Sequence, residues 1–328
     1  MIGCFSGKPV YIIFQTPERA GSRGSGAIWV RYKYRRSEKH IMKLAIGIDL
    51  GGSKIAGALV DENGKVLDRY VRPTEPNKPK EDIVGNIIEV ARLLNRKGVV
   101  AIGIGAPGFF DSEGRLIFVP NVKKLHKVNL KKEVSKGIRL PIYLANDATC
   151  FALAECRHGA AKGRKNVVGV VIGTGVGSGI VINGKAYHGA IGGAGEIGHT
   201  KIKTEDDGMI EFEKIISGTA FLKKYESLSG RSARSIAEIS KSDDSFRKVY
   251  HKFVQYTGVL FANLVNTLNP EMIVVGGGLS NLDFYDDVER RMRKLAVSEL
   301  GAACRVRKNR LGADAGAIGA ALLALENL

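Results

Sequence analysis

Apolar and polar residues follow the same plan in two stretches of the chain, and each stretch predicts three strands. Residues 42–71 read MKLAIGIDLGGSKIAGALVDENGKVLDRYV, in which a Gly/Ser turn joins two apolar runs and Asn-Gly leads to a third. Residues 166–189, NVVGVVIGTGVGSGIVINGKAYHG, repeat this plan. Asn-Gly between apolar runs is a strong hairpin signal. Two copies about 125 residues apart predict a duplicated domain rather than a short-period repeat.

Helices and further strands follow each copy. After the first copy we expect a helix at residues 80–97, a strand at 99–107, a helix near 130–137, a strand at 141–145 and a helix from 146 onward. After the second copy we expect a Gly-rich loop at residues 189–199 and a mostly helical region up to 269. A strand at 271–279, a helix after 279, a strand-like segment at 303–309 and a last helix at 312–325 are expected to follow. This alternation predicts an α/β fold whose two lobes leave a cleft, where ligands tend to bind.

The predicted domains divide the chain into three parts. Residues 1–41 are rich in Gly and Arg and show no sustained period, so we expect a poorly ordered extension with Met42 as the working start. The alternative is a short extra strand at VYIIF, residues 10–14. The N-terminal lobe is expected at 42–145 together with the final helix, 312–328, and the C-terminal lobe at 146–311.

Charge and cysteine content narrow the class of protein. The 328 residues include 50 Lys and Arg against 33 Asp and Glu, a net charge of +17. That excess fits a nucleic-acid surface or an anionic small substrate, and the scattered basic residues favour the second, without a nucleic-acid partner. The four cysteines form no metal or disulfide motif, which favours a reduced cytoplasmic setting. No apolar run approaches the roughly 20 residues of a membrane span, so no membrane partner is expected.

A polar pair interrupts the apolar stretch YLANDATCFALAE, residues 143–155. Asn146 and Asp147 stand between a predicted buried strand and a predicted helix. The simplest interpretation is a helix N-cap, because Asn and Asp side chains accept hydrogen bonds from the first free N–H groups of a helix. The alternative is a chemical role, because a packed core excludes such a pair unless it is satisfied or used.

Three glycine clusters predict a nucleotide site. The turns Asp49–Lys54 and Gly173–Gly177 occupy corresponding positions of the repeat, where backbone N–H groups can be aimed at an anion. Neither is a Walker P-loop, since no GxxxxGK[ST] leads into a helix. The third cluster, Gly276–Gly278, ends a strand and permits the close approach of a flat group such as a purine.

Two polar residues in GAGEIGH, residues 193–199, predict a sugar contact. Glu196 and His199 are close enough along the chain to hold adjacent hydroxyls of one ligand. The alternative for a single His is a structural role. The sequence offers no further residues at the spacing of a metal site.

These motifs together resemble one family. DLGGSK, AIGIGAPG, VPNV, LANDATCFALAE, GTGVGSG, GAGEIGH and NPEMIVVGGGLS resemble, in order, the ROK family of sugar kinases and repressors, over about residues 43–328. The resemblance implies the actin-like (RNase H-like, hexokinase-type) fold, with a duplicated βββαβαβα core that holds ATP and sugar in the cleft between its two lobes.

The resemblance also implies roles for individual residues. Asp147 would be the catalytic base that takes the proton of the sugar 6-hydroxyl, and Asp49 would lie near Mg²⁺. Phosphoryl transfer asks mainly for positioning and charge stabilisation, which a carboxylate at Asp147 can supply. The expected sugar contacts are Asn121, Asn146, Asp147, Glu196, His199 and Glu213. The expected ATP contacts are Gly51, Gly52, Ser53, Lys54, Thr174, Gly175, Gly277 and Gly278.

The sequence departs from the family in one motif. Most members place CxCGxxGC between the equivalents of His199 and Glu213, and its cysteines bind a structural zinc together with the His. Here the stretch reads TKIKTEDDGMIEF and contains no cysteine. Asp206 and Asp207 offer oxygen donors, which suit a tetrahedral zinc site poorly. We therefore expect no structural zinc.

The expected activity is that of an ATP- and Mg²⁺-dependent hexokinase of the glucokinase type. An N-acetylmannosamine or N-acetylglucosamine kinase is the alternative within the class. A sugar-responsive repressor is the alternative from another class, but the 41-residue extension is too short for the winged helix-turn-helix of such proteins. We expect a homodimer or a higher homo-oligomer.

Overall fold

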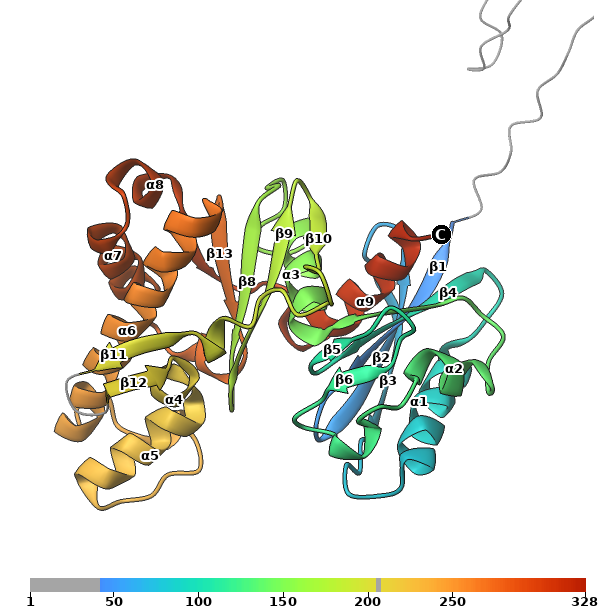
Figure 1. The fold of residues 1–328 in the computed structure, drawn as a ribbon, viewed down its shortest axis with the longest axis horizontal. Helices are drawn as coiled ribbons and strands as arrows, with labels where there is room; N and C mark the ends of the chain where they lie inside the picture. Colours follow the sequence, from blue (N-terminus) through green and yellow to red (C-terminus); the bar gives the residue numbers. More distant parts are fainter. Residues whose placement is uncertain (1–41, 205–207) are drawn as a thin grey trace, which may run out of the picture. The chain divides into compact units, whose positions relative to one another are not determined.

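Two five-stranded sheets of identical strand order organise the molecule (Figure 1). The computed structural model describes residues 42–204 and 208–328. The predicted extension at 1–41, with its VYIIF segment, lies outside the described residues, as do Asp206 and Asp207.

The first sheet contains β1, β2, β3, β4 and β7, which are Leu44–Leu50, Lys54–Asp61, Val66–Pro73, Val99–Ala106 and Ile142–Asn146. Their order is β3-β2-β1-β4-β7. The first three strands pair antiparallel, as the two hairpin signals predict, whereas β4 and β7 run parallel to β1. Parallel neighbours end at the same edge, so the ends of β1, β4 and β7 lie together.

The second sheet repeats this arrangement with β8, β9, β10, β13 and β14, which are Val167–Ile172, Val176–Ile182, Lys185–Tyr187, Met272–Gly276 and Arg305–Lys308. Their order is β10-β9-β8-β13-β14, again with three antiparallel strands followed by two parallel ones. The predicted duplicated α/β fold is confirmed.

Two helices pack between the sheets. Helix α3 (Asp147–Arg157) packs on β8 and β9, helix α9 (Ala315–Glu326) packs on β1 and β4, and the two helices contact each other (Figure 1). Helix α1 (Lys80–Leu94) covers β1, β2 and β3. Because α3 begins where β7 ends, the first sheet and the central helix pair together position the residues at that junction.

Glycines allow the close packing of α9. A Cβ on Gly47 of β1 would overlap the carbonyl oxygen of Ala317, and one on Gly103 of β4 would overlap that of Ala320. On the other side of α9, a Cβ on Gly319 would overlap the Cys150 carbonyl oxygen of α3. Backbone therefore meets backbone at these positions, with no side chain between.

The remaining helices belong mainly to the second half. They are α2, α4, α5, α6, α7 and α8, at Leu130–Ser135, Glu213–Ile216, Gly218–Ser229, Asp244–Leu268, Tyr285–Leu295 and Ser298–Ala303. Single 3-10 turns η1 to η5 lie at Lys123–Leu125, Ile197–His199, Ile236–Glu238, Gly278–Asn281 and Gly312–Asp314. Phe221, Phe253 and Phe284 pack in edge-on contacts in the core of this half.

The expectation of a mostly helical region after His199 is wrong at its start. Strands β11 (Lys201–Thr204) and β12 (Gly208–Glu211) form an antiparallel hairpin there before the helices begin. A second small hairpin, β5 (Phe109–Phe110) and β6 (Leu116–Phe118), lies in a stretch expected to be a loop. Both hairpins are short and carry charged residues, so their alternation is too brief to predict strands.

Three element ends differ from expectation for local reasons. Helix α1 ends at Leu94 because Asn95 has an extended backbone. Strand β13 ends at Gly276, since Gly277 adopts φ +85°. Helix α9 begins at Ala315, after the 3-10 turn η5.

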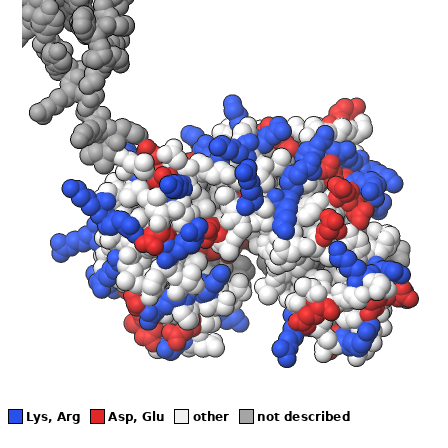
Figure 2. Space-filling model, turned by 180° about the vertical axis from the view of Figure 1, so that it is seen from behind, with Lys and Arg blue, Asp and Glu red and all other residues white. Residues whose placement is uncertain are grey.

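Charged side chains are spread over the surface. On the face drawn in Figure 2, Lys and Arg extend across the molecule with Asp and Glu among them. Several of these pair; Glu289, for example, lies 2.5 Å from Arg293 and 3.1 Å from Arg307. Within residues 42–204 and 208–328, none of the helices combines the length and the apolar character that crossing a membrane requires.

Candidate active site

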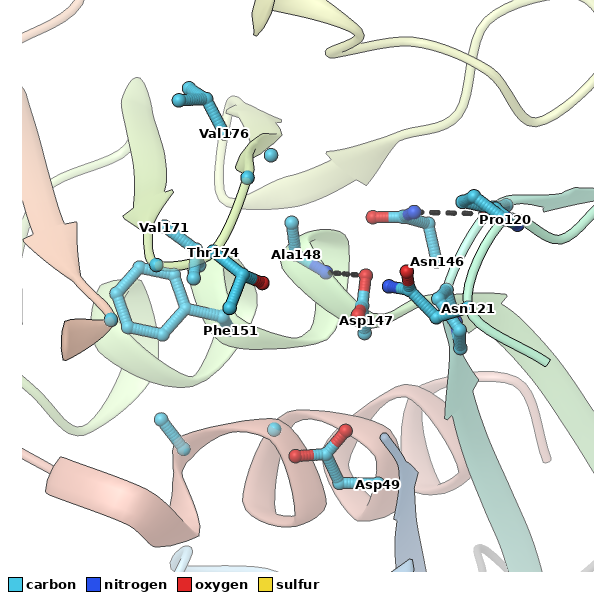
Figure 3. Close-up of a pocket in the computed structure, with 18 of the residues that line it drawn as sticks. Asp49, Pro120, Asn121, Asn146, Asp147, Ala148, Phe151, Val171, Thr174 and Val176 are labelled. Atoms are coloured by element: carbon cyan, nitrogen blue, oxygen red, sulfur yellow. Dashed lines mark hydrogen bonds between the residues drawn. The ribbon is translucent and has the colours of Figure 1, made fainter. Parts of the chain in front are cut away.

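A cavity of about 350 Å³ lies where the ends of β1, β7 and β8 face the N-terminus of α3 (Figure 3). Ten of the predicted site residues line it. They are Asp49, Asn121, Asn146, Asp147, Thr174, Gly175, Glu196, His199, Glu213 and Gly277. The two halves of the sequence therefore contribute to one cavity, as the duplicated fold predicts.

The side chains of Asn146 and Asp147 have different surroundings. Asn146 is the N-cap of α3: its Oδ1 accepts from the Thr149 N–H at 3.1 Å, and its Nδ2 donates to the Gly108 carbonyl at 2.9 Å. Asp147 Oδ1 accepts the adjacent Ala148 N–H, at 2.8 Å, and its carboxylate faces the cavity. The cap interpretation thus applies to Asn146 and leaves Asp147 available for chemistry.

The carboxyl groups of Asp49 and Asp147 in the cavity both have raised pKa values. Burial, together with the nearby Asp147, raises the pKa of Asp49 to about 7, against the opposing effect of Lys54. Burial also raises the pKa of Asp147, an effect opposed by the hydrogen bond from the Ala148 N–H. Asp49 lies tightly on α9, since a Cβ on Gly316 would be 2.6 Å from its Oδ2. Two buried acids with little countercharge form a site suited to a cation.

The two glycine turns present backbone donors. In the first turn, the Gly51 N–H donates to the Lys54 carbonyl at 2.9 Å, and no hydrogen bond within the described chain uses the N–H of Gly52 or Ser53. In the second turn, the N–H groups of Thr174 and Gly175 are equally unused by described partners. Two turns with outward N–H groups can hold an anion between them.

The second turn is fixed by the α4–α5 region. The Gly218 N–H donates to the Gly173 carbonyl at 2.7 Å, and Thr219 Oγ1 donates to the Thr174 carbonyl at 2.8 Å. Glu213 Oε2 accepts the Val176 N–H at 2.8 Å. The carboxylate of Glu213 therefore supports the turn as well as lining the cavity.

One end of the cavity suits a flat ring. Gly277 must be glycine, because a Cβ there would lie 2.5 Å from the Ile172 carbonyl oxygen and φ is +85°. A Cβ on Gly278 would meet nothing within 4 Å. Phe151 and Asn309 line the same cavity, the first as an aromatic wall from α3.

The opposite end gathers hydrogen-bonding side chains. Asn121 and Asn146 lie on one side of Asp147, whereas Thr174 lies on the other (Figure 3). His199 Nε2 is 3.8 Å from Glu196 Oε2, so the two are neighbours as the GAGEIGH motif predicts. Burial raises the pKa of Glu196, opposed by the nearby His199.

Five predicted residues do not line the cavity. They are Gly51, Gly52, Ser53, Lys54 and Gly278. Gly52 adjoins it, because a Cβ there would lie 3.2 Å from Asn121 Cβ. Lys54 is close enough to lower the pKa of Asp49.

Several lining residues are not predicted from the sequence, chiefly Phe118, Phe151, Asn309 and Gly316. The signal for Gly316 was the small-residue run GADAGAIG before the last helix, which marks close backbone packing. Phe118 stands immediately before the VPNV motif, and nothing in its own pattern distinguishes it from a core residue.

Nothing in the described chain forms a zinc site. Among residues 42–204 and 208–328, no group of three or more His, Cys, Asp or Glu is arranged to hold a metal ion. His199 instead lies between two carboxylates, with Nδ1 3.7 Å from Glu211 Oε2. The absence of structural zinc stays a prediction, to be tested by metal analysis.

Comparison with known proteins identifies the family. Residues 45–327 match the ROK family. The chain belongs to the ROK family. Its relatives include the glucokinases of Halalkalibacterium halodurans, 30% identical over 84% of this chain and 92% of the relative, and of Streptomyces coelicolor, 32% identical over 87% and 98%. The N-acetyl-D-glucosamine kinase of Haemophilus influenzae is 28% identical over 85% and 98%.

Solved structures of the ROK family share the fold. The ROK hexokinase from Thermus thermophilus superposes with a TM-score of 0.76 at 28% identity, covering 87% of this chain and 98% of that one. A ROK glucokinase from Streptomyces griseus, in complex with glucose and AMPPNP, gives 0.71 at 30% identity over 86% and 99%. The actin-like fold is therefore that of a ROK sugar kinase.

Proposed function

We propose that this ROK protein is an ATP-dependent kinase that phosphorylates the 6-hydroxyl of a hexose, with glucose as the leading substrate. The observation that carries the proposal is the position of Asp147. Its carboxylate is not used as the helix cap and lies between a glycine turn with free N–H groups and a group of sugar-binding side chains. That is where a base must lie to act between a hydroxyl and a phosphate.

The sugar would occupy the end of the cavity that contains Asn121, Glu196 and His199. Carboxylate and imidazole groups hold hydroxyls by hydrogen bonds, and the partial burial of Glu196 strengthens the bonds that it forms. Asp147 would accept the proton of the 6-hydroxyl as the hydroxyl oxygen forms a bond to the γ-phosphorus of ATP. At the same time, the bond between the γ-phosphorus and the oxygen that leaves with ADP breaks. Orientation of the hydroxyl by Asp147 is as important as the proton transfer.

The nucleotide would occupy the other end, between the two glycine turns. The free N–H groups of Gly52, Ser53, Thr174 and Gly175 suit the phosphate oxygens. The space beside Gly278 suits the adenosine. Asp49 would hold the Mg²⁺ carried by ATP, since it is a partly buried carboxylate beside a second acid, and carboxylate oxygens are the ligands that Mg²⁺ prefers. The ion would supply neutralisation of the phosphate charge.

A second candidate substrate class is the N-acetylhexosamines. The relative from Haemophilus influenzae, an N-acetyl-D-glucosamine kinase, is nearly as similar to this chain as the glucokinases are. The same base and phosphate turns serve either sugar, because the two differ only at the 2-position.

A sugar panel with coupled ADP detection tests the proposal. Purified protein, Mg·ATP and each of glucose, mannose, N-acetylglucosamine and N-acetylmannosamine are compared. We expect the highest kcat/KM with glucose, and a product that carries phosphate at the 6-position by NMR. A preference for either N-acetylhexosamine would transfer the proposal to the second class. Turnover with none of the hexoses would refute it.

We also propose that the N-terminal lobe comprises residues 42–145 together with the final helix, and that the C-terminal lobe comprises residues 146–311. Assembly as a homodimer or higher homo-oligomer in the cytoplasm is part of the same proposal. Light scattering of the purified full chain reads the oligomeric state directly.

A further inference from the structure

His199 lies between two carboxylates that compete for one imidazole. Its Nε2 is 3.8 Å from Glu196 Oε2, and its Nδ1 is 3.7 Å from Glu211 Oε2. Glu196 lines the cavity, whereas Glu211 does not. A neutral imidazole carries a single proton, so it can donate to only one of the two.

The choice of nitrogen decides whether sugar can be held. If Nε2 carried the proton, His199 and Glu196 would satisfy each other and neither would need a sugar hydroxyl. If Nδ1 carries the proton, Nε2 presents a lone pair to the cavity beside the Glu196 carboxylate. Two adjacent hydroxyls can then donate, one to each acceptor.

Several neighbours hold Glu211 in place and keep its carboxylate ionised beside Nδ1. It is the last residue of β12 and pairs in register with Lys201 of β11, whose Nζ lies 2.7 Å from Glu211 Oε1. Lys214 lies 3.9 Å from Glu211 Oε2. The side chain of Glu211 is 21% exposed, against 35% for Glu196. Its neighbours, first of all the hydrogen bond from Lys201, lower the pKa of Glu211, so it remains an acceptor over the working range of a kinase.

The hairpin fixes the geometry of this contact. The Phe212 N–H donates to the Thr200 carbonyl at 3.1 Å, which closes the base of the β11–β12 hairpin next to both His199 and Glu211. Phe118 contacts the imidazole edge-on, with the ring centroids 6.3 Å apart, and limits its rotation. The ring is therefore held from two sides while its Nε2 edge stays on the cavity side.

We propose that Glu211 is a positioning residue for sugar binding: its carboxylate, 3.7 Å from His199 Nδ1, favours the tautomer that carries the proton on Nδ1 and so leaves Nε2 as an acceptor for a substrate hydroxyl. This rests on the proposed function for its role in sugar binding, although the state of the imidazole exists without substrate.

The first test reads the imidazole directly. The full chain is labelled with ¹⁵N in its six histidines, and long-range ¹H–¹⁵N spectra at pH 8 report which ring nitrogen is protonated. The His199→Ala variant identifies the His199 signals by their loss. We expect the Nδ1–H form in the parent and a shift toward Nε2–H in Glu211→Ala. The control is Met209→Ala, which changes an exposed residue of the same strand and should leave the spectrum as in the parent.

The second test reads sugar binding. Glu211→Ala should raise the KM for sugar by roughly 5- to 30-fold, with kcat and the KM for ATP within about twofold of the parent. Glu211→Gln should lose less, since its amide oxygen still accepts from Nδ1–H. In the His199→Ala background, Glu211→Ala should have no further effect on the KM for sugar, because the two act through one contact.

Specific results would overturn the proposal. They are an Nε2–H form in the parent, an unchanged tautomer in Glu211→Ala, or losses that add fully in the double variant. Because the tautomer is read without turnover, a protein that phosphorylates no hexose would refute the proposed function while the spectra still decide the role of Glu211.

Discussion

Asp147 combines two properties that a helix terminus rarely gives one side chain. It starts α3, where a carboxylate is stabilised by the free N–H groups and the helix dipole, yet burial keeps its pKa raised. Because Asn146 provides the cap, replacing the Asp147 carboxylate should disturb the helix little. The residue can therefore be tested for chemistry separately from stability.

Asp147→Asn should lower kcat by roughly 10²–10⁴ while the KM for sugar changes by no more than a few-fold. The amide keeps the size of the side chain but cannot take a proton from the 6-hydroxyl. Steady-state kinetics and the melting temperature are measured on the same preparation. Turnover near that of the parent would remove Asp147 from the proposed mechanism.

The raised pKa of Asp147 predicts the acid side of the pH profile. A base works only as the carboxylate, so activity is lost as pH falls through its pKa, and a raised pKa moves that loss above the usual range of aspartate. At saturating Mg·ATP, kcat/KM for sugar should fall at a higher pH than a free aspartate would give. Activity that stays flat down to pH 4 would contradict this assignment.

At the scale of elements, α3 and α9 cross in close backbone contact near the site. Gly319 lies directly on the Cys150 carbonyl oxygen, and Cys150 is one helical turn after Asp147. A displacement of α9 at this crossing would therefore shift the first turn of α3, which contains the proposed base Asp147.

Gly319→Ala should destabilise the protein by about 1–3 kcal/mol, because its methyl group forces the two backbones apart. The matched control is Gly85→Ala in α1, where a Cβ meets nothing within 4 Å and alanine should stabilise the helix by about 0.5–1 kcal/mol. Denaturant unfolding of the two variants reads both effects. Equal changes in the free energy of unfolding at the two positions would show that helix propensity, rather than packing, determines the effect of the substitution.

The sequence predicts elements wherever a period is sustained. The two strand triplets and α1 have long apolar periods, and the structure confirms them. The β11–β12 hairpin could not be predicted in this way, because its strands have four residues each and Lys201, Lys203 and Glu211 leave little apolar alternation. Its register depends on pairing that only the folded chain defines.

The site shows the same limit at the scale of the molecule. Asp147 and His199 stand in motifs, so the sequence alone predicts them as cavity residues. Glu211 reads as an ordinary surface charge, and it gains a role only because the hairpin brings it to Nδ1 of His199. Gly316 likewise matters only because α9 returns to Asp49. Contacts between distant segments are what the sequence pattern does not contain.

The whole molecule is expected to need no structural metal. The purified protein should contain far less than one zinc per chain. After EDTA treatment and removal of the chelator, Mg²⁺ alone should restore full activity, because it is needed only with the ATP phosphates. Elemental analysis and activity recovery check both parts. A content of about one zinc per chain, or activity that is recovered only when zinc is added, would contradict the prediction. Glu213 would then no longer be counted among the expected sugar contacts.

The packing of α9 on β1 and β4 has a consequence for how the protein is made. These strands end at Ala106 and are translated well before the helix that covers them, which begins at Ala315. At about 5–20 residues per second, the nascent chain carries that uncovered sheet face for on the order of 10–50 s. The first sheet therefore cannot complete its core until α9 has been translated, and a chaperone that shields Gly47, Gly103 and their apolar neighbours would raise the yield of native kinase.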